Sequence, residues 1–255
     1  MCILAWNWQP TQSTPLLLLA NRDEFYARPT QAAHWWNTDQ ILAGRDLQAG
    51  GTWLGISPGG RLAALTNYRL PVPDTAMRPS RGTLVADFLR SDVDANSYLQ
   101  SLAQRMDAFQ PFNLLVYDGK QLMGLESRHQ RVFAVAPGIG AVSNADFGTS
   151  WPKLLQLKNA LQQELLHPFV EAQHYLPLLQ NPQRAPWESL PNTGIERTWE
   201  HALSAIFIAE SDYGTRASSI VCMTQNSVQF LEQSYGPQGP SQTLHFSFDL
   251  RHIAS

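Results

Sequence analysis

Residues 1–8 read MCILAWNW and residues 16–24 read LLLLANRDE, with the turn-forming segment PTQSTP at 10–15 between them. Both apolar runs are typical of strands, and the Pro-, Ser- and Thr-rich segment favours a turn. We expect strands over residues 1–8 and 16–21 that pair as an antiparallel hairpin. With the turn centred near residue 12 or 13, Cys2 lies opposite Arg22 or Asp23.

Cys2 directly follows Met1, so removal of that methionine would make Cys2 the N-terminal residue. Such a residue carries a thiol nucleophile and also a base, its α-amine, whose ordinary pKa is about 7.7–8.0. N-terminal-nucleophile (Ntn) hydrolases work in this way. We expect the methionine to be removed, since a small residue follows it. The alternative is that Cys2 is an ordinary small residue at the start of a strand.

Arg22 and Asp23 are the charged residues that the hairpin brings to Cys2. A cation lowers the pKa of a nearby thiol, and a carboxylate stabilises a nearby ammonium group. We therefore expect this pair to hold the thiolate and the amine. A solvated, charged hairpin end would show the same residues.

The composition is that of a globular chain without a basic surface. Its 255 residues are 44% hydrophobic and carry a formal net charge of −3, so nucleic acid is not expected as a partner. No apolar run approaches the roughly 20 residues that a membrane helix needs, and the first residues lack the layout of a signal peptide. We expect a cytoplasmic protein without a membrane span.

Cys2 and Cys222 are the two cysteines of the chain, too few for a disulfide scaffold or a metal-ligand cluster. No metal site is expected. Cys222 falls in a strand-like run, and at ~3.3 Å per residue it lies about 20 Å beyond Arg216. We expect it to be a buried core thiol outside the site.

The remaining pattern predicts many strands and a few helices. Further strands are expected at 40–44, 52–57, 61–66, 112–117, 122–126, 132–136, 140–143, 205–208, 218–224, 228–233 and 243–248. Helices are expected at 82–90, 95–108, 151–166 and 169–180, and a loop at 181–200. Without a repeat or linker, this order favours one α+β domain over residues 1–255 and is compatible with a four-layer αββα sandwich.

Several sequence blocks spread over nearly the whole chain resemble the signature blocks of the NRDE family, also called transport-and-Golgi-organisation protein 2. They are LANRDEFYARP (19–29), AGRD (43–46), GGTWLGIS (50–57), LAALTNY (62–68), GTLV (82–85), FNLL (112–115), LPNTG (190–194) and YGTR (213–216). The resemblance implies an Ntn-hydrolase-like αββα sandwich of mostly antiparallel sheets. It also implies a layout related to choloylglycine hydrolases and penicillin V acylases.

The resemblance assigns the catalytic role of nucleophile to Cys2. Arg22 and Asp23 match the arginine and aspartate that follow the first hairpin of those acylases. There the two are usually separated by two residues, whereas here they are adjacent. Glu24 is therefore an alternative to Asp23.

Three later residues complete the site that the resemblance implies. Asn67 and Asn144 match two asparagines whose amides could donate to an oxyanion, and Arg216 matches a late arginine that could clamp a carboxylate or an oxyanion. Each has a structural alternative. Asn67 could cap a hairpin end, Asn144 could cap a turn, and Arg216 could form a structural ion pair.

The ligand is expected to be a small molecule held by Arg22 and Arg216, with Trp53 and Tyr68 beside them. One reading is a Cys2-dependent hydrolase of an amide or thioester that requires no cofactor. The other is a carrier, because family members are linked to haem trafficking and to acyl-CoA or lipid handling. For haem, no histidine lies inside a family block, and Cys2 would be the candidate axial ligand. A scaffold role is a third alternative, and protein partners are not specified by the sequence.

Overall fold

The computed structural model describes residues 2–37, 40–71, 78–166 and 171–250. In this part of the chain the strands form two sheets, and every strand pairing within them is antiparallel. Met1, on which the expected processing depends, lies outside the described residues.

The first sheet has the strand order β10-β1-β2-β11-β12-β13. Its strands are β1 (Cys2–Trp8), β2 (Leu16–Phe25), β10 (Gly138–Val142), β11 (Tyr213–Met223), β12 (Ser227–Gly236) and β13 (Gly239–Asp249). The predicted first hairpin is confirmed, because β1 and β2 pair with Cys2 opposite Arg22. The strand β2 continues past its predicted end, so Arg22 and Asp23 lie within the sheet rather than in a solvated turn.

The second sheet has the order β3-β4-β5-β6-β7-β8-β9. Its strands are β3 (Thr30–Trp36), β4 (Ile41–Asp46), β5 (Leu54–Ile56), β6 (Leu62–Asn67), β7 (Phe112–Tyr117), β8 (Leu122–Glu126) and β9 (Arg131–Ala134). Neighbours in this sheet follow chain order, and the connection between β6 and β7 carries helical segments.

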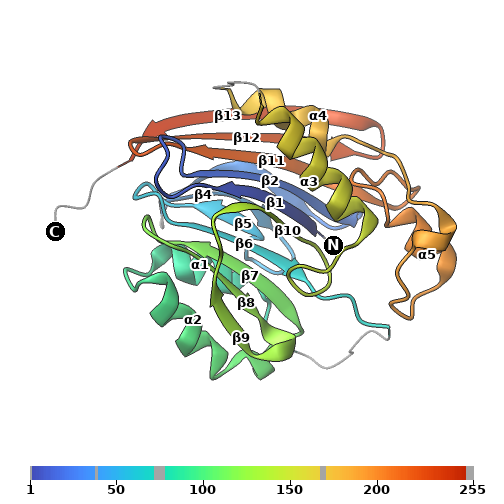
Figure 1. The fold of residues 1–255 in the computed structure, drawn as a ribbon, viewed down its shortest axis with the longest axis horizontal. Coiled ribbons are helices and arrows are strands. Elements are labelled where there is room, and N and C mark those ends of the chain that lie inside the picture. The colour runs from blue at the N-terminus through green and yellow to red at the C-terminus, as the bar shows by residue number, and fades with distance from the viewer. Residues whose placement is uncertain (1, 38–39, 72–77, 167–170, 251–255) are drawn as a thin grey trace.

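Helices cover the outer face of each sheet (Figure 1). On the second sheet, α1 (Gly82–Arg90) packs against β4 to β6 and α2 (Ala95–Ala103) packs against β8 and β9. On the first sheet, α3 (Pro152–Glu164) packs against β10 and β1, and α4 (Leu176–Leu179) packs against β11 and β2. The expected αββα sandwich is therefore confirmed.

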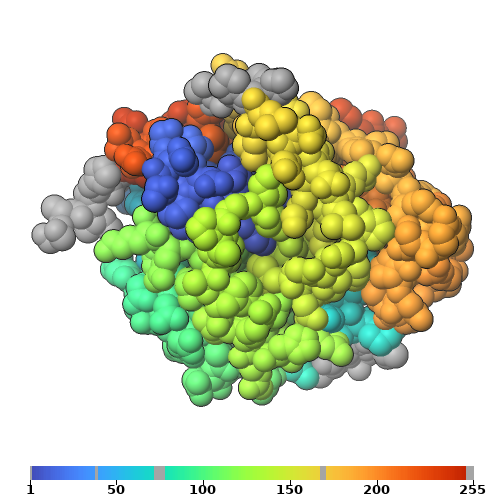
Figure 2. Space-filling view, in the orientation of Figure 1, coloured from blue at the N-terminus to red at the C-terminus, as the bar shows by residue number. Residues whose placement is uncertain are grey.

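Shorter helical segments lie in the connections. They are α5 (Arg197–Ala202) and the 3-10 turns η1 (Met106–Ala108), η2 (Ser127–His129), η3 (Ala172–Tyr175) and η4 (Trp187–Ser189). The segment around α5 forms a bulge at one side of the molecule, away from the first hairpin (Figure 2).

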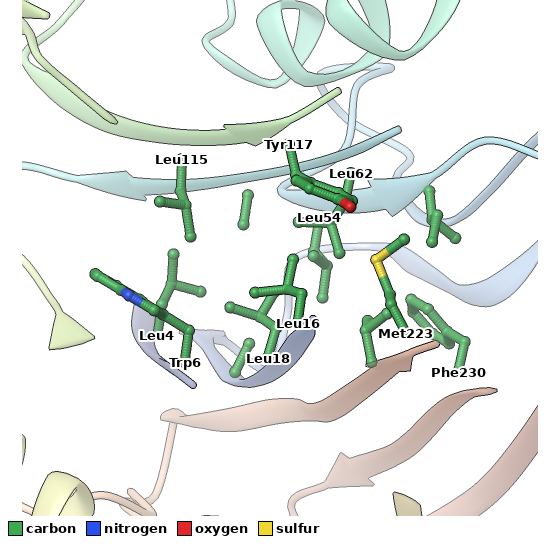
Figure 3. Close-up of a cluster of buried hydrophobic side chains, with 14 of the residues drawn as sticks. Leu4, Trp6, Leu16, Leu18, Leu54, Leu62, Leu115, Tyr117, Met223 and Phe230 are labelled. Atoms are coloured by element: carbon green, nitrogen blue, oxygen red, sulfur yellow. The ribbon is translucent and has the colours of Figure 1, made fainter. Parts of the chain in front are cut away.

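The core between the sheets is built from alternate residues of the strands (Figure 3). Leu4, Trp6 and Leu18 project from the first sheet toward Leu54 and Leu115 of the second, and all five are buried. The intervening residues of β1 and β2 face the other way, into a separate apolar cluster beneath α3 and α4. This alternation, with its period of two, decides which side chains reach the inter-sheet space.

Some expected elements are wrong. Residues 205–208 form no strand, because their backbone bends and Phe207 N–H donates to the carbonyl of Asn181. The helix expected at 95–108 ends at Ala103 and resumes as a 3-10 turn. The expected helix at 169–180 divides into η3 and α4, with residues 169–170 outside the described part. The expected loop at 181–200 contains the start of α5. The strand β3 was not expected.

Among the described residues, no helix combines the length and apolar character that crossing a membrane requires.

Candidate active site

A cleft of about 580 Å³ lies between the two sheets, where the ends of β1, β2 and β6 meet the N-terminal end of α1. Its described wall is strongly charged. The cations are Arg22, Arg28, Arg45, Arg78, Arg81 and Arg216, and the acids are Asp23, Glu24, Asp46 and Glu232. The excess of guanidinium groups over carboxylates suits an anionic ligand.

Cys2 points into this cleft from the first position of β1. Because Leu4 and Trp6 face the inter-sheet core, the alternation of the strand places the Cys2 side chain on the same inner face. The residue is 6% exposed. Burial raises the pKa of its thiol, Asp23 and Glu24 add to the rise, and Arg22 opposes it. The thiol therefore needs a base, since the cation beside it does not outweigh burial.

Arg22 lies on the same inner face, directly opposite Cys2. Its Nη2 is 3.5 Å from Asp46 Oδ2 and 3.9 Å from Glu24 Oε2. Its Nη1 is buried and makes no hydrogen bond within the described part of the chain. Asp46 is held more closely by Arg28, at 2.7 Å. Arg22 thus has donor capacity left for a ligand in the cleft.

Asp23 occupies the opposite face of β2, although it also borders the cleft. Its Oδ1 accepts a hydrogen bond of 2.8 Å from the Thr215 hydroxyl, and its backbone carbonyl accepts one from Tyr213. It is 1% exposed, and burial raises the pKa of its carboxyl group. Because side chains alternate along β2, Arg22 lies on the face of the sheet that carries the Cys2 thiol, and Asp23 lies on the opposite face.

Glu24 is placed differently from Asp23. It returns to the inner face, is partly exposed, and lies 3.8 Å from Arg28 and 3.9 Å from Arg22. Of the two candidate acids, the buried one is Asp23.

Asn67 and Asn144 are neighbours with different roles. Asn67, at the end of β6, lines the cleft, and its side-chain amide makes no hydrogen bond within the described residues. Asn144 is fully buried and does not line the cleft. Its amide donates to the Asn67 carbonyl at 2.8 Å, and the adjacent Ser143 hydroxyl donates to the Cys2 carbonyl. The Asn67 amide can therefore bind a ligand, and Asn144 fixes the Asn67 backbone through its hydrogen bond.

Arg216 borders the cleft at a bulge in β11, but its donors are directed to backbone carbonyls and to the Thr30 hydroxyl. Its Nη1 lies 3.0–3.2 Å from the carbonyl oxygens of Phe25, Tyr26 and Arg28. Its Nε donates to the Tyr235 carbonyl at 3.3 Å. This geometry ties down the connection from β2 to β3. It differs from both the expected ligand clamp and the alternative of an ion pair.

The two aromatic residues expected beside the ligand lie in different places. Trp53 lines the cleft, whereas Tyr68 is absent from the described wall and places its hydroxyl 3.4 Å from Asp146 Oδ2. The second cysteine is half-buried rather than fully buried, on the outer side of β11 among apolar residues near α4. Its pKa is raised by burial.

The sequence model of a family described as Transport and Golgi organisation 2 matches residues 1–237. The chain belongs to this family. The Transport and Golgi organization protein 2 homolog of Bos taurus is 35% identical over 265 residues, which cover 95% of this chain and 96% of that protein. The Mus musculus homolog is 34% identical over 261 residues, 92% of this chain and 93% of its own.

Solved structures of an Ntn hydrolase share the fold of this family member. A C2A mutant of the conjugated bile acid hydrolase from Clostridium perfringens gives a TM-score of 0.54 at 8% identity, with 98% of this chain and 92% of that chain covered. Another variant of that hydrolase gives a TM-score of 0.54 at 9% identity, with 97% of this chain and 92% of that chain covered. At these identities the likeness shows the fold alone, and the fold is of the Ntn-hydrolase type.

Three further charged residues of this chain lie in or near the site and were not expected. Arg81, just before the GTLV block, lines the cleft, interacts electrostatically with Cys2 and donates to the Pro111 carbonyl at 3.0 Å. Glu232 lines the cleft from β12. Lys153 lies behind the first sheet on α3 and interacts electrostatically with Asp23 and Cys2.

The burial of Lys153 could have been predicted from the spacing of residues in the sequence. Lys153, Leu157 and Leu161 follow one another at intervals of four residues, which places the lysine on the buried stripe of α3. Arg81 and Glu232 offered no comparable signal, because packing between distant segments brings them to the cleft.

The loop that contacts the start of α1 depends on two glycines. Gly50 has φ +76°, a left-handed conformation that favours glycine. A Cβ on Gly51 would lie 2.5 Å from the backbone carbon of Gly82, so only glycine allows this approach to the start of α1. The GG pair therefore provides a turn and a close backbone contact.

Proposed function

We propose that this protein is a Cys2-dependent Ntn hydrolase that cleaves an amide or thioester bond of a small acyl ligand. The supporting observation is that three groups line one cleft: a buried thiol, the Arg22 Nη1 and the Asn67 amide. The two nitrogen groups are donors without a hydrogen bond in the described part of the chain. A nucleophile flanked by such donors suits acyl transfer, in which negative charge develops on an oxygen.

In the first half of the proposed reaction, the α-amine of processed Cys2 takes the Sγ proton and the thiolate attacks the carbonyl carbon. The carbonyl π electrons move to the oxygen, which the Asn67 amide stabilises. The tetrahedral intermediate then collapses. The bond to the leaving nitrogen or sulfur breaks, and the leaving group takes the proton from the α-ammonium, which leaves an acyl thioester on Cys2.

In the second half, water gives a proton to the α-amine as it attacks the acyl thioester. The intermediate expels the Cys2 thiolate, which recovers that proton, and the acid product leaves. The amine is required twice, because burial raises the thiol pKa and keeps the sulfur protonated at neutral pH. Removal of Met1 is therefore part of the proposal, and we expect the protein to act in the cytoplasm, where its thiols stay reduced.

The test begins with the intact mass of the protein from its native cell, which we expect to lack one methionine. Thioester and amide probes are then supplied to the parent protein, Cys2→Ser and Cys2→Ala. We expect turnover and a Cys2-linked acyl adduct only in the parent, and nearly unchanged probe binding in Cys2→Ser. Cys222→Ala is the matched control, because it removes the other thiol, and it should behave like the parent.

Other results would overturn the assignment. Turnover that persists equally in both Cys2 variants would exclude Cys2 as the nucleophile. A parent protein that retains Met1 and binds an acyl compound or haem without turnover would instead favour the carrier reading. In that case the absorption spectrum of bound haem in Cys2→Ala would show whether the thiolate is an axial ligand.

A further inference from the structure

Lys153 is a buried cation without a hydrogen-bond partner in the described residues. It lies in the first turn of α3, is 2% exposed, and its Nζ makes no hydrogen bond there. A buried ammonium group is costly unless it is paired, and a methionine or leucine would fill the same space at less cost. Such a residue is a candidate for a role other than packing.

The charges that face Lys153 come from four segments. Lys153 interacts electrostatically with Asp23 on β2, Cys2 on β1, Arg69 in the segment after β6 and Glu200 on α5. Arg69 and Glu200 already form an ion pair of 2.6 Å, buried on both sides. Among the neighbouring charges, Asp23 has the strongest effect on the lysine.

The proposed reaction adds one more basic group to this environment. The nitrogen of Cys2 lies at the end of β1, beside the β2 segment that carries Asp23, and α3 packs against β1 (Figure 1). When Cys2 is N-terminal, its α-amine and Lys153 share the charge of one carboxylate. Two ammonium groups near a single carboxylate repel each other, so the pair loses one proton more readily than either group alone.

We infer that Lys153 is a positioning residue for the nucleophile: its buried charge keeps the α-amine of Cys2 unprotonated, so that the amine can accept the thiol proton. This inference rests on the proposed function. Burial lowers the pKa of Lys153 to about 8, with Asp23 opposing the shift, so the lysine carries its charge at neutral pH. The ordinary pKa of an α-amine, about 7.7–8.0, is close enough for a nearby cation to shift its charge state there.

The test is a titration that does not require catalysis. The chain with Cys2 at its N-terminus is prepared with isotope-labelled cysteine, which gives NMR signals from Cys2 and Cys222 that Cys222→Ala distinguishes. We expect the amine pKa of Cys2 to rise by about one pH unit in Lys153→Met and in Lys153→Gln. In Asp23→Asn we expect it to fall. Lys158→Met, which removes a half-exposed lysine of the same helix, should leave it unchanged.

A second readout is the pH dependence of thioester turnover, whose acidic limb should move upward in Lys153→Met by the same amount as the amine pKa. A purely structural lysine would lower the rate at every pH and leave the limb in place. An unchanged amine pKa in both Lys153 variants overturns the inference, even if the parent hydrolyses its probe. A parent without turnover whose amine pKa still depends on Lys153 supports it and overturns only the proposed reaction.

Discussion

Glu232 places an ionisable group where ionisation is unfavourable. It is 3% exposed, and burial raises the pKa of its carboxyl group to about 7, against the opposing effects of the Ala33 N–H and Arg22. The folded protein therefore holds this proton more tightly than the unfolded chain does. The stability that this provides is complete below the ordinary pKa of 4.5 and is lost as the pH rises through about 7.

We expect Glu232→Gln to be close to the parent in stability at about pH 4.5 and more stable by about 1–3 kcal/mol at about pH 8. The glutamine keeps an acceptor for the Ala33 N–H, which donates to Glu232 at 2.7 Å. Urea unfolding at both pH values measures the difference. The exposed Glu188→Gln is the control and should show no such dependence. Equal stability differences at the two pH values would contradict the prediction.

Site residues could be predicted from the sequence when the residues they contact lie nearby in the chain. Cys2 and Arg22 are joined by a single hairpin, so turn position and strand pairing fixed them within one residue. Lys153, Arg81 and Glu232 reach the site through packing of segments far apart in sequence. A single sequence gives no register for such contacts, and the family blocks do not include any of the three.

At the scale of elements, Arg216 joins the end of β2 to the start of β3. We expect Arg216→Ala to lose about 1–3 kcal/mol of stability, because three backbone carbonyls lose their charged donor. Arg216→Lys should be nearly as unstable, since an ammonium group cannot reproduce a planar fork of donors. Urea unfolding and chymotrypsin cleavage after Tyr26, which should accelerate, are the measurements.

The control for this prediction is Arg184→Ala, which removes an arginine from a more exposed ion pair with Glu210. Its effect should stay within about 0.5 kcal/mol. If Arg216→Ala instead retains full stability but loses affinity for an anionic ligand, Arg216 is a ligand clamp after all.

Elements with a clean pattern were predicted closely, and the failures have physical causes. The helix at 82–90 and the strands at 112–117 and 122–126 match α1, β7 and β8, because each has a strong apolar period and a clear end. The strand β3 mixes Gln31 and His34 with tryptophans, and its pairing with β4 shifts between those two residues. Residues 205–208 show the reverse error, since a short apolar run fits either a strand or a buried turn.

At the scale of the whole molecule, the inter-sheet core couples the two sheets. Leu18 is fully buried in the cluster that both sheets share. We expect Leu18→Ala to cost about 2–5 kcal/mol and to shift far-UV circular dichroism and tryptophan fluorescence together. Leu155→Ala, on the exposed side of α3, should change stability by about 0.5 kcal/mol or less. Separate transitions for the two signals would show that the sheets unfold independently.

The ion pair between Arg22 and Asp46 joins one sheet to the other, with 3.5 Å between its nitrogen and oxygen atoms. Asp46 also has a closer partner, Arg28, at 2.7 Å. The free protein thus supplies its own counterion to the arginine beside its nucleophile. An anionic ligand would have to exchange places with that counterion, and Asp46 would keep Arg28 when it is displaced. A neutral ligand of the same shape would leave the pair intact. The cleft would then distinguish anionic from neutral ligands by exchanging one anion beside Arg22 for another. The number of charges buried in the cleft would change little in that exchange.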